Sequence, residues 1–237
     1  MHTDTSLYAQ AVKQVVDHFS RFTESMVWLP ENILFDIFYQ VYNDRSTPQS
    51  SATLASELRS FDLFSKLLKV GNRRGNLHQI IQFTASTNTS FLTSLVQSLQ
   101  KGLEAGINFG GFLMEAGRFL EAINTFRICL TNVDSQNLPG FWREEIQCRL
   151  LNSLSNYCLF SEAETVFNAL NNTVKSNPNL PKPLVCRIFN QFSVYSFLCS
   201  SYNESFQWSL QALKLIRQIG ICIITMKEPG LLPETEL

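Results

Sequence analysis

The sequence predicts an all-α fold in which a short N-terminal helical segment precedes helix pairs stacked as a right-handed α-solenoid. Apolar residues recur with the helical period along the chain, and no segment shows the alternation of a half-buried strand. A pattern of small and aromatic residues also returns at intervals of 41 and 42 residues, as in repeat proteins. Apolar residues make up 45% of the 237-residue chain, which is enough for a substantial core.

The N-terminal segment contains two predicted helices. The first begins near Leu7 and extends to about residue 21, with Leu7, Ala11 and Val15 on one face because they are spaced four residues apart. The second begins at Pro30, where the missing amide hydrogen costs nothing in the first helical turn. This helix extends to about residue 42 and is apolar around most of its circumference, so we expect it to be buried on most sides.

A polar, turn-rich stretch over residues 43–52 is the best candidate for a linker. Short helices are expected after it, at about 54–58, 61–70, 77–84 and 89–102. The basic loop at 71–75 has the composition of a phosphate-contacting loop, but no Walker-type Lys-Ser/Thr follows it, which favours a solvated turn.

An internal repeat begins at about residue 103. Its first copy places Gly110 on one helix and Phe126 on the next, so that the backbones approach closely and the ring fills the space between them. The residues predicted to pack the helix pairs are Gly110, Ala122 and Phe126 in the first copy, Ala163 and Phe167 in the second, and Ser205 and Ala212 in the third.

This pattern is typical of tetratricopeptide helix pairs, although the copies are longer than the usual repeat of about 34 residues. Turn-forming residues at 139–140 and 177–183 account for the extra length. Gly220 is expected to end the last helix. The segment after it lacks a polar capping helix, so we expect a truncated or alternatively ended chain. The predicted organisation is therefore 1–45 N-terminal helices, 46–102 connecting helices, 103–217 three repeats and 218–237 an irregular tail.

Composition narrows the classes of function. A formal net charge of −1 provides no strong field for nucleic acid or an anionic membrane. No apolar stretch approaches the roughly 18 residues of a membrane span, so no membrane insertion is expected, and the N-terminus does not resemble a secretory signal. Only 16% of residues are charged while 19 are Phe, which favours apolar partner surfaces. The six cysteines form no C-x-x-C pair and are expected to be free thiols in a reducing compartment.

Catalytic chemistry is not expected. His2, His18 and His78 lie in separate segments, and the nucleophile-elbow, dinucleotide and zinc-protease motifs do not occur. The glycines at 102–111 are spaced for close helix packing rather than for a phosphate loop. We therefore expect a non-catalytic protein with no metal ion and no cofactor.

Three segments resemble the N-terminal part of the amyloid protein-binding protein 2 family in order and spacing. They read Leu-Pro-Glu-Asn-Ile-Leu-Phe-Asp-Ile at 29–37, Phe-Gly-Gly-Phe-Leu-Met-Glu-Ala-Gly at 109–117 and Tyr-Asn-Glu-Ser-Phe-Gln-Trp at 202–208. The resemblance extends from about residue 6 to residue 217. The two N-terminal helices also resemble the two-part box by which substrate receptors attach to Elongin C and a cullin.

The resemblance implies a substrate-receptor subunit of a cullin-2 RING ubiquitin ligase, located in the cytoplasm and also the nucleus. It implies Elongin B/C and cullin 2 as partners, together with a protein substrate. By analogy Leu7, Ala11 and Val15 would bind Elongin C, although many such boxes carry cysteine where Ala11 stands. Three further residues would face the cullin: Leu29, Pro30 and Ile33.

Two other interpretations remain open from the sequence. In one, the repeats bind peptides and the chain is a cargo or cytoskeletal adaptor without a role in the ligase. The resemblance implies sorting signals, such as the basolateral signal of amyloid precursor protein, and microtubules as what such an adaptor would bind. In the other, the chain is a nonfunctional truncated product with an unstable exposed end. The family's substrate groove is described as lying on later repeats, outside this chain.

Overall fold

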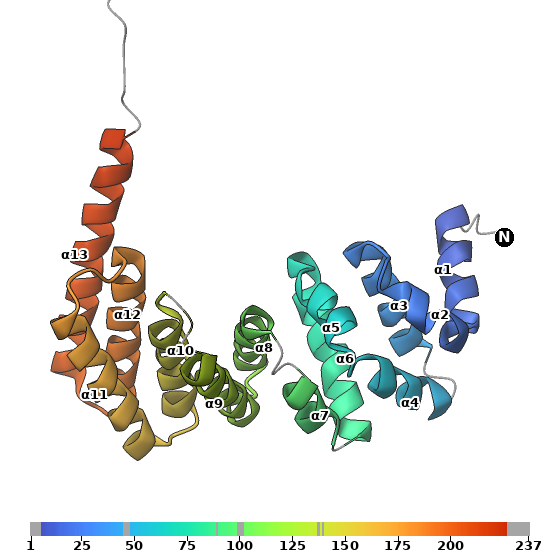
Figure 1. Ribbon diagram of the computed structural model, residues 1–237, viewed down its shortest axis with the longest axis horizontal. Coiled ribbons are helices and arrows are strands. Elements are labelled where there is room, and N and C mark those ends of the chain that lie inside the picture. Colours follow the sequence, from blue (N-terminus) through green and yellow to red (C-terminus); the bar gives the residue numbers. More distant parts are fainter. Residues whose placement is uncertain are drawn as a thin grey trace, which may run out of the picture. The chain divides into compact units, whose positions relative to one another are not determined.

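The computed structural model describes residues 6–44, 48–88, 90–98, 102–136, 138 and 140–226, and its elements are all helices (Figure 1). The predicted all-α class is therefore confirmed for these residues. The chain divides into two compact units, Met1–Asn132 and Val133–Leu237. The predicted segments 1–45, 46–102, 103–217 and 218–237 rest on motifs rather than on compactness, and they stay predictions.

The first unit is built from short helices separated by turns. In chain order these are α1 (Leu7–Asp17), α2 (Phe19–Met26), α3 (Glu31–Asn43), α4 (Pro48–Glu57), α5 (Phe61–Leu68), the 3-10 turn η1 (Gly71–Arg73), α6 (Arg74–Thr87), α7 (Phe91–Ser98) and α8 (Leu103–Glu115). The next helix, α9 (Phe119–Gln136), begins in the first unit and ends in the second.

Some helix bounds differ from the prediction. The single first helix is instead α1 and α2, because His18 leaves helical geometry at φ −124° and ψ 28°. The predicted linker is already helical from Pro48, which starts α4 with the fixed φ that suits a first turn. The predicted end at Gly220 is wrong, since the last helix continues to Met226. The rest of the predicted tail lies outside the described residues.

Helix α3 is at the centre of the first unit. It packs against α1, α4, α5 and α6. Its buried side chains are Leu34, Phe35, Ile37, Phe38, Val41 and Tyr42. The expectation that this helix is buried on most sides is therefore confirmed, and α3 provides a rigid base for the residues that precede it.

Gly110 of α8 lies directly against Phe126 of α9. A Cβ atom built on Gly110 would lie 2.4 Å from Cε1 of Phe126, whose ring is fully buried. Ala122 is also fully buried. The ring of Phe126 thus occupies the space that a side chain at residue 110 would need.

The second unit contains α10 (Trp142–Asn156), α11 (Phe160–Ser176), α12 (Lys182–Leu198) and α13 (Tyr202–Met226). Helix α12 packs against both α10 and α13. Glu145 of α10 joins two of these helices, because its carboxylate pairs with Arg149 on the same helix at 2.8 Å and with Arg187 of α12 at 2.7 Å. The pair with Arg187 connects α10 to α12.

The same backbone motif ends α8, α10 and α12. A residue with positive φ closes each helix: Gly117 at 71°, Cys158 at 61° and Ser200 at 62°. In each case the next amide N–H donates to a carbonyl five residues earlier: Arg118 to Leu113 at 2.9 Å, Leu159 to Leu154 at 2.9 Å, and Ser201 to Ser196 at 2.8 Å. These are Schellman caps. They recur at intervals of 41 and 42 residues, the spacing of the sequence repeat.

The residue packed between the paired helices differs from copy to copy. The positions equivalent to Gly110 are Leu151, which is fully buried, and Ser193. The Ser193 hydroxyl forms hydrogen bonds with the hydroxyls of Ser205 at 3.1 Å and Ser209 at 2.7 Å. The third copy therefore closes its helix pair with buried serines where the first uses a glycine and a phenyl ring.

Phe167 of α11 packs against the helices that follow it. Its ring centroid lies 4.3 Å from that of Phe192 on α12 and 6.1 Å from that of Trp208 on α13. Ala163 on the same helix is fully buried, and Ala212 of α13 is buried. This aromatic cluster links three successive helices of the second unit.

Helix α13 carries a row of exposed apolar side chains and continues past the end of α12 (Figure 1). Tyr202, Phe206, Leu213 and Ile216 are between 52% and 62% exposed. Their spacing of four, seven and three residues places them on one helical face. The ring of Tyr202 also meets that of Phe197 edge to face, at 5.6 Å between centroids.

None of the helices within the described ranges is long and apolar enough to cross a membrane.

Candidate protein-interaction site

Helix α1 is held to the first unit by one of its faces. The Ser6 hydroxyl caps the helix by accepting a hydrogen bond from the amide of Ala9 at 3.2 Å. Val12 is buried at 5% exposure. Just after the helix, Phe19 meets Phe38 of α3 edge to face at 5.4 Å. The helix is therefore docked on α3 through the face that carries Val12, whereas Leu7 lies on another face.

The residues predicted to bind Elongin C lie on that other face. Leu7 is 83% exposed, Ala11 is exposed, and Val15 is half-buried. Leaving a leucine in water forgoes about 1.5–3 kcal/mol of burial free energy. None of the three is sealed beneath the described helices of this chain, so a partner has access to them.

A polar network ties α1 to α3 beside this face. The Tyr8 hydroxyl donates a hydrogen bond to the carboxylate of Asp36, which also pairs with Arg73. The Arg73 guanidinium lies 5.4 Å from the centroid of the Phe35 ring, a cation–π distance. Partial burial, followed by the hydrogen bond to Asp36, raises the pKa of Tyr8 to about 12. At neutral pH Tyr8 is therefore a stable hydrogen-bond donor.

The turn between α2 and α3 carries the residues predicted to face the cullin. Pro30 is exposed, and Leu29 and Ile33 are half-buried. The carbonyl of Pro30 accepts the amide hydrogen bond of Leu34 at 3.0 Å, which starts α3. The next side chains, Leu34 and Phe35, are fully buried. The turn thus presents its apolar residues at the edge of a rigid core.

Lys66 of α5 holds the backbone of this turn by hydrogen bonds. Its ammonium group donates to the carbonyl oxygens of Val27 and Leu29, the latter at 3.1 Å. The amide of Leu29 also donates to the carbonyl of Met26 at 3.0 Å, and the Met26 side chain is buried at 1% exposure. The backbone on both sides of residue 28 is therefore anchored.

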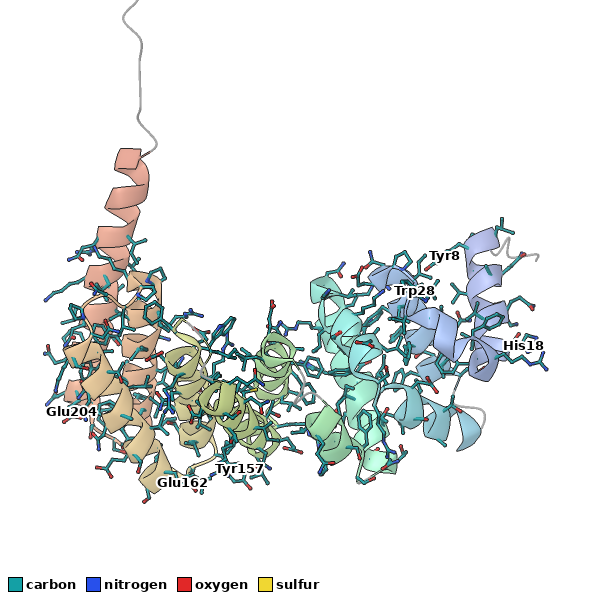
Figure 2. All side chains as sticks on the ribbon, viewed as in Figure 1. Tyr8, His18, Trp28, Tyr157, Glu162 and Glu204 are labelled. Carbon is teal, nitrogen blue, oxygen red and sulfur yellow. The ribbon has the colours of Figure 1, made fainter. Side chains whose placement is uncertain are left out.

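Sequence reasoning missed Trp28, which is 86% exposed in the middle of this turn. It also missed Tyr8 and Phe22, which are 48% and 42% exposed. Figure 2 shows Tyr8 and Trp28 on the first unit. The available signal was a tryptophan directly before Leu-Pro in a turn between two helices.

The two histidines within the described residues lie in different surroundings. His18 is exposed, and His78 is half-buried with its Nε2 atom 3.2 Å from the carbonyl of Phe112. Within the described ranges no group of three or more His, Cys, Asp or Glu side chains is placed to hold a metal ion. His2 lies outside those ranges.

Comparison with known proteins finds a distant relative. The chain is 25% identical over 229 aligned residues to amyloid protein-binding protein 2 from Rattus norvegicus, and equally to that from Mus musculus. The chain is distantly homologous to amyloid protein-binding protein 2. The alignment covers 89% of this chain but only 38% of the relative, so the chain spans well under half the length of the curated proteins it matches. No family model matches the sequence.

The resemblance inferred from the three sequence segments is therefore confirmed at the level of distant homology. The name of this relative says that it binds an amyloid protein, and that statement applies to the relative alone. The predicted Elongin, cullin and repeat-packing residues stay predictions.

Proposed function

We propose that this chain is a non-catalytic adaptor, the substrate-receptor subunit of a cullin-2 RING ubiquitin ligase. It would link Elongin B/C and cullin 2 to a protein substrate in the cytoplasm and nucleus. The supporting observation is that α1 buries Val12 against its own fold while Leu7 stays 83% exposed on another face.

The proposed mechanism is helix-in-groove recognition. Leu7, Ala11 and Val15 would enter an apolar groove of Elongin C, and burying them there recovers free energy that the isolated chain leaves unused. Leu29, Pro30 and Ile33 would contact cullin 2 from the adjoining turn. Because the fold already orders both elements, little conformational entropy is lost on binding.

The helix pairs α8–α9, α10–α11 and α12–α13 are proposed to be tetratricopeptide-like units of a right-handed α-solenoid. The equally spaced caps at Gly117, Cys158 and Ser200 support this proposal. Within the second unit, the pair α10–α11 buries Phe167 against Phe192 of the pair that follows it, as stacked repeats do.

Capture of Elongin B/C by purified chains tests the proposal. Leu7→Asp should weaken capture at least about tenfold, because a charged group cannot enter an apolar groove. Aspartate in the first turn of a helix favours the helix dipole, so α1 should persist and circular dichroism should not change. The matched control is Leu120→Asp on α9, an exposed leucine at 43% exposure outside the site, which should bind like the wild type. Undiminished capture by the Leu7 variant would show that the box is assigned wrongly.

A second candidate function is a peptide-binding cargo adaptor with affinity for sorting signals or microtubules. The observation that favours it is the exposed aromatic group of Phe197, Tyr202 and Phe206 in the second unit. A fluorescent peptide from the cytoplasmic tail of amyloid precursor protein should then bind the chain, and Phe206→Ser should weaken that binding. Equal anisotropy of the peptide with the wild type and with the Phe206→Ser variant would argue against this function.

A further inference from the structure

Trp28 is exposed to an unusual degree for its residue type. Tryptophan is highly buried on average in folded proteins. The other two tryptophans of the chain follow that tendency more closely: Trp142 is 38% exposed, and Trp208 packs against Phe192 at 5.0 Å between ring centroids. Trp28, at 86%, keeps nearly its whole indole in water.

This exposure is not the result of an unsupported loop. Lys66 donates to the carbonyls on both sides of Trp28, and Met26 is buried just before it. Lys66 is itself half-buried, and its ammonium group makes both of these hydrogen bonds. The fold therefore fixes the backbone of a side chain that it does not bury.

A fixed backbone with an exposed indole is the arrangement expected of a binding anchor. Tryptophan is enriched among residues that dominate interface energies, because it buries a large apolar area in a pocket of the partner. Ordering the turn in advance removes part of the entropy cost of binding. Trp28 directly precedes Leu29 and Pro30 in the chain, so one partner surface would cover all three.

We infer that Trp28 is the main anchor of the cullin-binding surface, inserting its indole into an apolar pocket of that subunit, and that Lys66 is a positioning residue for it. This inference rests on the proposed ligase function. It adds a residue outside the predicted set and divides the site into an Elongin part on α1 and a cullin part centred on residue 28.

The test uses the full chain in complex with Elongin B/C and measures its affinity for cullin 2 by biolayer interferometry. Trp28→Ala should weaken cullin binding by about thirtyfold, as expected for an interface hot spot, and should leave Elongin C binding unchanged. Lys66→Met, which keeps the length of the side chain but removes the donor, should weaken it by about three- to tenfold. Trp142→Ala is the matched control, since it removes a partly exposed tryptophan in the second unit.

A spectroscopic measurement separates contact from an indirect effect. The difference between the emission of the wild type and of Trp28→Phe should shift to the blue when cullin 2 is added, because the indole leaves water. Cullin affinity of Trp28→Ala within twofold of the wild type would overturn the inference and leave the ligase proposal standing. Loss of Elongin C binding in that variant would also overturn it. A wild-type complex that fails to bind cullin 2 would overturn both.

Discussion

At the scale of single residues, Gly110 shows how packing between paired helices restricts the residue type at one position. The Phe126 ring lies where any β-carbon at residue 110 would have to be. Gly110 lies twelve residues before Ala122 in the sequence, which is the spacing of the small residues in a predicted helix pair. The same count leads to Leu151 and Ser193 in the other copies, where the contact is made differently. Such substitutions depend on compensating neighbours, which one sequence does not reveal.

Gly110→Ala should therefore destabilise the first unit by about 1–3 kcal/mol, the usual cost of overpacking a core. Gly75→Ala is the control, because a β-carbon on Gly75 in helix α6 meets no atom within 4 Å. That change should be neutral or stabilise by up to about 1 kcal/mol through helix propensity. Urea denaturation measures both. Partial rescue of Gly110→Ala by Phe126→Leu would identify the ring as the cause, and equal effects of the two alanines would contradict the packing argument.

At the scale of elements, the three Schellman caps set where the first helix of each pair ends. Gly117 was recognisable in the sequence, because glycine adopts positive φ without strain. Cys158 and Ser200 were not, because these residue types rarely adopt that conformation. The predicted helix ends were also only approximate. Caps and turns depend on local tertiary contacts, which hydrophobic periodicity does not encode.

Replacing glycine at a cap and introducing glycine at a cap should change the stability of the protein in opposite directions. Gly117→Ala should lower the stability by about 1 kcal/mol, since a side chain at positive φ is strained. No neighbouring atom lies within 4 Å of the new β-carbon, so the effect is conformational alone. Ser200→Gly should raise the stability by up to about 1 kcal/mol by removing that strain. Melting temperatures of the wild type and the two variants test this order of stability. A Gly117→Ala variant more stable than the wild type would contradict the strain argument.

At the scale of the whole molecule, helical periodicity was enough to predict the all-α class but not the division at residue 132. Helix α9 runs through that boundary without a break, and no linker composition marks it. Division into compact units reflects the density of tertiary contacts, which only folded coordinates reveal. In the candidate site, residue spacing predicted that Leu7, Ala11 and Val15 share one face of α1, and only the resemblance suggested that a partner binds it. The clamp of Lys66 on the Trp28 turn joins residues nearly forty positions apart, which the sequence does not reveal.

Two buried thiols allow the units to be followed separately. Burial raises the pKa of Cys129 in the first unit to about 11, and burial is the largest cause that raises the pKa of Cys148 in the second to about 12. Both should resist alkylation at pH 8, whereas exposed Cys158 should react at once. Gly110→Ala should speed labelling of Cys129 and leave Cys148 unchanged, as read by peptide mass spectrometry. Equal acceleration at both thiols would show that the units open together.

The apolar row along α13 has a practical consequence for imaging. One face of α13 carries four half-exposed apolar side chains: Tyr202, Phe206, Leu213 and Ile216. Transfer of this face from water to an air–water interface is favourable, because apolar surface leaves water. Particles of this protein should therefore adsorb to the air–water boundary of a vitrified film through the second unit. Their views should be strongly biased, and a mild detergent that coats the film surface should restore an even distribution.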